Sequence, residues 1–128
     1  KNIQVQFVSS KKPGELWVRK CPCSFCTKQG NYNIADPGGK LLVKIKDAHK
    51  VIRYQMGHRT SDRLICQACG VYIGGFMVHE GQSLCVLNLN VLDEQSVFSS
   101  PTSINVSSQA PKERIEGRCD RWMPFEML

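Results

Sequence analysis

The sequence of 128 residues contains no apolar run long enough to cross a membrane, which takes about 20 consecutive apolar residues. It lacks the charged start, apolar core and small-residue cleavage site of a secretory signal. Aromatic residues make up only 8% of the chain, and no helical periodicity exceeds two turns. This absence argues against a helix that reads the major groove of DNA. We therefore expect an intracellular protein, cytoplasmic or nuclear, with no membrane partner.

Acidic residues are scarce in the first half of the chain. Residues 1–66 carry 13 basic and 4 acidic side chains, whereas residues 67–128 carry 4 basic and 7 acidic ones. The positive excess in the first half predicts a surface that faces anions, such as nucleic acid or a small acidic substrate. Ordinary solvated lysines would explain the same count equally well.

Apolar and polar residues alternate along much of the chain, which is the period of half-buried β-strands. Residues 47–49 predict a hairpin connection between two of these strands. Residues 95–111 are rich in serine and contain two prolines, which predicts an extended surface loop. The expected strands are 3–7, 15–20, 40–46, 50–56, 63–65, 71–80 and 84–92.

Seven cysteines are far more than chance supplies in a chain of this length. Cys21, Cys23 and Cys26 form a C-x-C-x-x-C cluster, and Cys66 and Cys69 form a C-x-x-C pair followed by glycine. Such spacing suits metal binding better than disulfides, because the disulfide loops would be short and strained. Sulfur donors in a closed tetrahedral site favour zinc over hard cations.

Two arrangements of zinc are open. In the first, Cys23, Cys26, Cys66 and Cys69 hold one zinc in a ribbon, and Cys21 is unused. In the second, Cys21, Cys23 and Cys26 hold a reactive zinc with one exchangeable position. Cys66 and Cys69 then contribute to a second zinc, which needs two further ligands.

A zinc bound by three thiolates carries a formal charge of −1, and a substrate thiolate would add to it. Nearby cations such as Lys20, Lys28 and Arg63 could offset that charge. Basic side chains are also expected to receive the carboxylates of a small substrate. The sequence indicates no general acid or base.

The other cysteines and the histidines are expected to have no role in metal binding. Cys85 lies in an alternating apolar run, which predicts a buried core thiol. Cys119 lies in the charged tail and is expected to be a bystander. His49, His58 and His79 show no ligand spacing with one another and predict turn or surface positions.

These patterns predict a single, mainly β domain. Residues 1–94 are expected to form its zinc-binding β core. Residues 95–128 are expected to form a serine-rich loop and a C-terminal tail packed on the same domain. Trp122, Met123, Phe125 and Met127 give this tail apolar side chains with which to pack.

The cysteine motifs resemble those of the glutathione-dependent formaldehyde-activating enzyme family, which includes the domain of centromere protein V. The resemblance implies an antiparallel β-tent fold with two zinc ions. It implies an active-site zinc on the C-x-C-x-x-C residues and a structural zinc on the C-x-x-C pair plus an earlier C-x-C. The family's type member joins formaldehyde and glutathione into S-(hydroxymethyl)glutathione, so a zinc-dependent carbon–sulfur lyase acting on a small thiol such as glutathione is implied. The resemblance extends over residues 1–94 and rests on Cys21-Pro22-Cys23-Ser24-Phe25-Cys26, Arg63-x-x-Cys66-x-x-Cys69-Gly70, Val86-x-Asn88 and Leu92-Asp93.

Two features depart from the family pattern. Residue 22 is proline where histidine is common, and the early C-x-C pair is absent. In the family that pair directly precedes a strand resembling residues 1–7, so we expect it immediately ahead of Lys1 in the natural chain. The second zinc site would then be two ligands short here. The alternative function is a non-catalytic zinc module that binds nucleic acid or protein.

Overall fold

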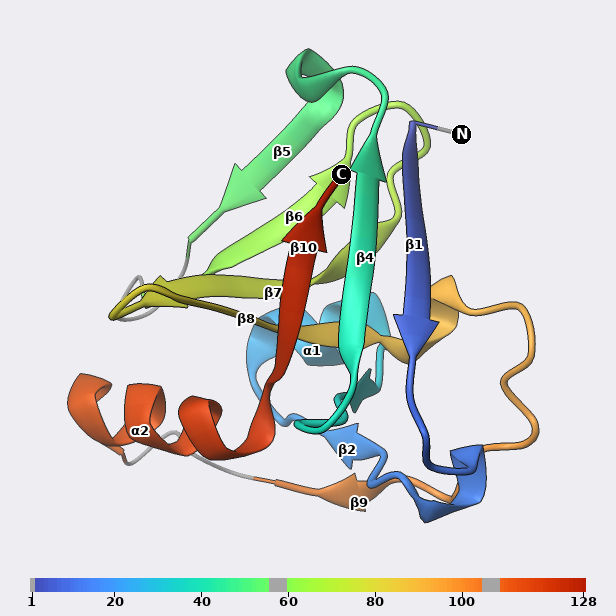
Figure 1. Ribbon diagram of the computed structural model, residues 1–128, viewed down its shortest axis with the longest axis vertical. Coiled ribbons are helices and arrows are strands. Elements are labelled where there is room, and N and C mark those ends of the chain that lie inside the picture. Colours follow the sequence, from blue (N-terminus) through green and yellow to red (C-terminus); the bar gives the residue numbers. More distant parts are fainter. Residues whose placement is uncertain (1, 56–59, 105–108) are drawn as a thin grey trace.

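The computed structural model describes residues 2–55, 60–104 and 109–128, and it is mainly β, as the alternating sequence predicted (Figure 1). Its elements, with η marking a 3-10 helix, are β1 (Ile3–Val8), η1 (Pro13–Glu15), β2 (Arg19–Lys20), α1 (Ser24–Gln29), β3 (Asn33–Ile34), β4 (Lys40–Ile45), η2 (Ala48–Lys50), β5 (Val51–Tyr54), β6 (Asp62–Cys66), β7 (Tyr72–His79), β8 (Gln82–Asn88), η3 (Leu89–Val91), β9 (Thr102–Ser103), α2 (Pro111–Arg121) and β10 (Met123–Met127).

Strand β8 is the point at which the sheet branches. One of its edges pairs with β7 in an antiparallel meander that continues through β6 to β5. Its other edge pairs first with β10, which leads to β4 and β1. On this same edge of β8, the last two residues of the strand pair with β3, and β3 leads on to β2 and β9. Within the described residues the sheet ends at β1, β5 and β9 and is not closed.

The sheet is mixed, which corrects the expectation of an antiparallel structure. Strand β10 runs parallel to β4, and β9 runs parallel to β2. Both parallel pairs join the first half of the chain to a segment beyond residue 94. Parallel neighbours need a long crossover between them, and the long separation along the chain supplies it.

The predicted hairpin at residues 47–49 is wrong, because β4 pairs with β1 and β10 while β5 pairs with β6. The 3-10 helix η2 separates the two strands, and the Asp47 carboxylate accepts the His49 N–H at 2.9 Å. Asn2 holds both ends of this turn. Its side-chain oxygen accepts the Asp47 N–H at 2.8 Å, and its amide donates to the Lys50 carbonyl at 3.2 Å. Alternation shows which face of a strand is buried but not which strand lies beside it.

Two α-helices lie where the sequence indicated none. Helix α1 follows Cys23 and ends at Gln29, and the next residue, Gly30, has a φ of 65°, the left-handed conformation that favours glycine. Helix α2 begins at Pro111, and its start is capped by the Glu113 carboxylate, which accepts the Ala110 N–H at 3.1 Å. No helix in the described parts of the chain has the length and apolar character needed to cross a membrane.

The apolar face of α2 is too narrow to give a clear periodic signal. Ile115 and Cys119, one turn apart, are partly buried against the core, while most of the other side chains are charged. Segments 15–20 and 84–92 are also only partly strand, since β2 is two residues long and η3 follows β8. The serine-rich segment contains β9, and its residues 105–108 lie outside the described part of the chain.

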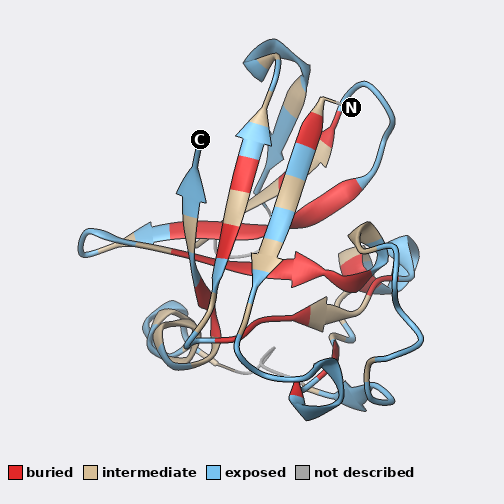
Figure 2. Ribbon diagram, turned by 45° about the vertical axis from the view of Figure 1, so that its right-hand side comes forward, coloured by how far each residue is buried: buried red, intermediate tan, exposed pale blue. Residues whose placement is uncertain are grey.

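Burial is concentrated along β7 and β8, against which the C-terminal tail packs (Figure 2). Of the four apolar tail residues, Trp122 and Met123 are buried in the core and Phe125 is partly buried against it, whereas Met127 is exposed. A Cβ on Gly75 would lie 3.1 Å from the Trp122 ring, and one on Gly74 would lie 2.2 Å from the Val86 carbonyl oxygen. The two glycines that interrupt the apolar run therefore permit the close approach of β8 and of the tail.

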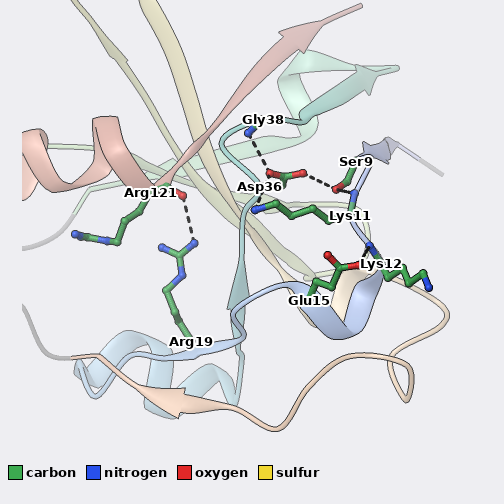
Figure 3. A network of polar contacts seen from close by, with 8 residues as sticks. All are labelled: Ser9, Lys11, Lys12, Glu15, Arg19, Asp36, Gly38 and Arg121. Carbon is green, nitrogen blue, oxygen red and sulfur yellow. Dashed lines mark hydrogen bonds and ion pairs between the residues drawn. The ribbon is translucent and has the colours of Figure 1, made fainter.

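A buried carboxylate joins the end of β1 to the segment before β4 (Figure 3). Asp36 is only 1% exposed, and it accepts hydrogen bonds from the Ser9 hydroxyl and from the Gly38 N–H. The ammonium group of Lys11 lies 3.9 Å from the same carboxylate. Because its oxygens are satisfied in this way, Asp36 can be buried without an uncompensated charge.

The turn between β7 and β8 contains the only non-glycine residue at positive φ among the described residues. Glu80 and Gly81 have φ values of 50° and 78°, which are the signs that a two-residue type I′ turn requires at both central positions. Glu80 is strongly exposed, and its ion pair with His79 is therefore weak.

Replacing Glu80 with asparagine should stabilise the protein by about 0.5–1 kcal/mol, because asparagine adopts the left-handed conformation at lower cost. Urea unfolding followed by circular dichroism would measure the change. Gly81→Ala is the matched control and should destabilise the protein. Equal stability of Glu80→Asn and the unmodified protein would contradict this account of the turn.

Candidate metal centre

Three sulfur atoms converge where β2 leads into α1. The Sγ atoms of Cys21, Cys23 and Cys26 all lie within 4.8 Å of one another. Cys23 occupies the position immediately before α1, and its sulfur accepts the backbone N–H of Cys26 at 3.4 Å. Cys26 lies in the first turn of the helix and is buried, whereas the other two are partly exposed. One helical turn thus supplies the local geometry that gathers the sulfurs.

This donor set fits a soft metal ion. A tetrahedral zinc with Zn–S bonds of about 2.3 Å needs its sulfurs roughly 3.8 Å apart, which is close to the observed grouping. Thiolates favour such ions over calcium or magnesium. Within the described residues no other histidine, cysteine or carboxylate joins the group. The C-x-C-x-x-C motif could therefore bind a metal through three protein ligands.

The three thiols share their protons unequally. A hydrogen bond from the Cys26 thiol, opposed by burial and assisted by Cys23 and by the charge of Arg63, lowers the pKa of Cys21 to about 5. The same hydrogen bond, together with burial, raises the pKa of Cys26 above its usual range. The cluster therefore holds a thiolate at neutral pH, which favours displacement of the remaining protons by a metal.

An arginine and three aromatic rings lie beside the cysteine cluster. The Arg63 guanidinium lies 4.8 Å from the centre of the Phe25 ring and donates to the Tyr72 hydroxyl at 3.3 Å. Phe25 packs edge-on against Tyr72 at 4.9 Å and stacks on Tyr54 at 5.8 Å. Burial opposes the charge of Arg63, yet Tyr72 and the nearby thiols raise its pKa overall. Arg63 is therefore a fixed positive charge next to the sulfurs.

The second cysteine motif forms a tight turn between β6 and β7. Cys66 is buried and Cys69 is exposed. Gly70 has a φ of 79°, and its N–H donates to the Cys66 carbonyl at 2.7 Å. Although burial opposes it, the amides of Cys69 and Ala68 and the Cys69 thiol lower the pKa of Cys66. Amides directed at a sulfur are typical of metal-binding knuckles.

The two cysteine motifs lie at opposite ends of β6. Arg63, near the start of this strand, is beside the C-x-C-x-x-C cluster, while Cys66 is its last residue. At about 3.3 Å per residue, three residues of strand span roughly 10 Å. No sulfur group among the described residues includes ligands from both motifs. The described structure therefore does not gather Cys23, Cys26, Cys66 and Cys69 into the single ribbon.

The other residues singled out in the sequence have simpler positions. Of the three cations expected near the cluster, Arg63 interacts with it, while Lys20 and Lys28 are exposed. Cys85 is fully buried, as predicted, and burial raises its pKa. Cys119 is partly buried on α2.

Among the histidines, His49 is exposed, and His79 is partly exposed next to Glu80. Neither joins the cysteine cluster. His58 lies outside the described residues.

Sequence reasoning missed the arginines that α2 contributes. Arg118 lies near enough to Arg63 and Cys21 for their charges to affect its pKa, although it is 97 residues from Cys21 along the chain. The second half of the sequence has a net negative charge, which conceals this local positive group. The sequence does contain a signal for this group, because arginine recurs at every third or fourth position of α2, at Arg114, Arg118 and Arg121.

The comparisons with known proteins bear on the fold alone. No protein-family model matches the chain, and no curated protein matches its sequence. A crystal structure of a Rhodobacter sphaeroides protein is similar, with a TM-score of 0.54 and 23% sequence identity. The alignment covers 80% of this chain and 90% of that protein. The likeness therefore extends over most of the β architecture described above.

The metal-free protein should react with iodoacetamide at Cys21 at pH 6, because the thiolate of Cys21 predominates above its pKa of about 5. Peptide mapping by mass spectrometry across pH 4–9 would measure the profile. Cys26→Ala removes the principal hydrogen bond and should move the profile to higher pH. Cys119→Ala is the control and should leave it unchanged. A Cys21 profile centred above pH 8 in the unmodified protein would contradict this assignment.

Proposed function

We propose that the protein is a zinc-dependent carbon–sulfur lyase acting on a small thiol adduct such as S-(hydroxymethyl)glutathione. The observation that carries the proposal is the convergence of Cys21, Cys23 and Cys26 on one point, with Arg63 beside them. The reaction class is formation or cleavage of the bond between a thiol sulfur and a hydroxymethyl carbon. The resemblance of the cysteine motifs to the formaldehyde-activating family agrees with this chemistry.

Each residue of the cluster has a distinct role in this proposal. Cys21, Cys23 and Cys26 hold the zinc, which when bound supplies a Lewis acid for the sulfur or oxygen of the adduct. Arg63 is held by Tyr72 and Phe25, and it offsets the negative charge that a substrate thiolate adds. A lysine with a free side chain could not provide so fixed a charge, because it would lose more rotamer freedom on binding.

The second zinc is proposed at Cys66 and Cys69. Both Asn2 and Gln67 donate hydrogen bonds to the Lys50 carbonyl, at 3.2 and 2.9 Å. Residue 2 therefore lies beside the turn that holds this cysteine pair. Among the described residues no third metal-ligating side chain joins Cys66 and Cys69, so this zinc needs further ligands.

Zinc content per chain distinguishes two sites from one. If the sites are separate, Cys23→Ser removes an ion that Cys69→Ser retains. A single shared ribbon would lose the same ion in every case. Inductively coupled plasma mass spectrometry on the purified protein would give the stoichiometry, with Cys119→Ser as the control that keeps all bound zinc.

Turnover should depend on the first cluster. The protein should accelerate the appearance of S-(hydroxymethyl)glutathione from glutathione and formaldehyde above the uncatalysed rate, as measured by NMR. Cys23→Ser should abolish this acceleration because it removes one of the three sulfur ligands. Cys119→Ser should retain it. Full activity in a demetallated Cys23→Ser protein would refute a zinc-centred mechanism.

A further inference from the structure

Four arginines from three separate parts of the chain form a connected group that reaches the cysteine cluster through Arg63 and Arg118. Arg19 comes from β2, Arg63 from β6, and Arg118 and Arg121 from α2. Arg118 lies within reach of the charges of Arg63, Arg121 and Cys21, and Arg19 lies within reach of the charge of Arg121. The guanidinium groups thus form a connected series that ends at the cysteines.

The arginines are held in place by neutral groups. Arg118 lies 4.8 Å from the centre of the Trp122 ring and donates to the Thr60 hydroxyl. Arg19 lies 5.0 Å from the Trp17 ring and donates to the Arg121 carbonyl at 3.4 Å. Figure 3 shows the Arg19 side chain extending from β2 toward the main chain at the end of α2. Aromatic faces and carbonyls orient a guanidinium but do not neutralise it.

Negative partners are missing from this part of the described structure. Among the described residues no carboxylate lies within 4.0 Å of Arg19, Arg63, Arg118 or Arg121. The Nε atoms of Arg19, Arg63 and Arg121 are buried without a hydrogen-bond partner. Arg19 is only 5% exposed. Burial, followed by the like charges of its neighbours, lowers the pKa of Arg118 to about 10, so it is still charged at neutral pH.

Arg19 is buried, and the other three arginines are partly buried. Such an arrangement is unfavourable unless an anion completes it, because cations withdrawn from water need a charged or hydrogen-bonding partner. The cysteine cluster cannot serve fully, since three thiolates with one divalent ion carry a formal charge of −1. A planar oxyanion matches the paired N–H donors of guanidinium groups. A nucleic acid backbone fits less well, because a side chain as buried as Arg19 is not accessible to a large ligand.

We propose that Arg19, Arg63, Arg118 and Arg121 form a binding site for a small oxyanion ligand, a carboxylate or a phosphate, next to the cysteine cluster. The site does not depend on the proposed lyase activity. Gly117 leaves space for one of these arginines, because a Cβ at position 117 would lie 2.6 Å from Nη1 of Arg121. The missing side chain leaves room for the Arg121 guanidinium to fold back over α2.

The test is titration of the zinc-loaded protein with inorganic phosphate and, separately, with succinate, followed by calorimetry and thermal unfolding. At least one anion should bind and raise the unfolding midpoint, and the tighter one identifies the ligand class. Arg118→Gln should weaken binding about ten-fold or more, as loss of charge-assisted hydrogen bonds does. Lys112→Gln alters an exposed cation on the same helix and should bind normally.

A second variant guards against simple misfolding of Arg118→Gln. Gly117→Ala keeps every arginine and favours the helix, yet it displaces the Arg121 guanidinium, so it should weaken anion binding without loss of stability. Absence of binding of both anions to the unmodified protein would overturn the proposal. Equal binding by Arg118→Gln, Gly117→Ala and Lys112→Gln would also overturn it. Because the readout is binding, failure of the lyase assay would leave this result unaffected.

Discussion

The pairing of β10 on both of its edges is the constraint on which the rest of the structure depends. This strand runs parallel to β4 and antiparallel to β8, so it joins the two parts of the sheet that would otherwise separate. Met123 is fully buried between them, and Trp122 packs on Gly75 of β7. Only Trp122 separates helix α2 from β10, and the position of the helix beside the cysteine cluster therefore follows from the same pairing.

The cysteine cluster and the arginines have complementary electrostatic requirements. The cluster concentrates negative charge on Cys21, whose pKa is lowered chiefly by the hydrogen bond from Cys26 and also by the charge of Arg63. Arg118 and Arg121 add positive charge beyond what the sulfurs can neutralise. A site with this excess suits a ligand that brings both a soft sulfur and an acidic group. The proposed lyase substrate and the proposed oxyanion site are compatible for this reason, although each is tested separately.

Strand positions followed well from the sequence, whereas strand partners did not. The alternation in residues 40–46 identified β4, in which buried and more exposed residues alternate. Residues 71–80 identified β7 as a nearly continuous apolar run, because that strand is buried on both faces. The same alternation could not show that β4 is next to β10, since that contact depends on residues more than 80 positions away. Helix α2 escaped detection because it buries only a narrow face, and its stability comes from its cap and from the docking of the following strand.

The amino-acid sequence by itself determined the cysteine cluster, since six consecutive residues and one helical turn bring Cys21, Cys23 and Cys26 together without help from the rest of the chain. Local hydrogen bonds of this kind depend only on near neighbours. Only the tertiary structure decided what surrounds the cluster. Arg63 and Arg118 meet there because burial of the tail favours one arrangement of the sheet, and no local pattern encodes that arrangement.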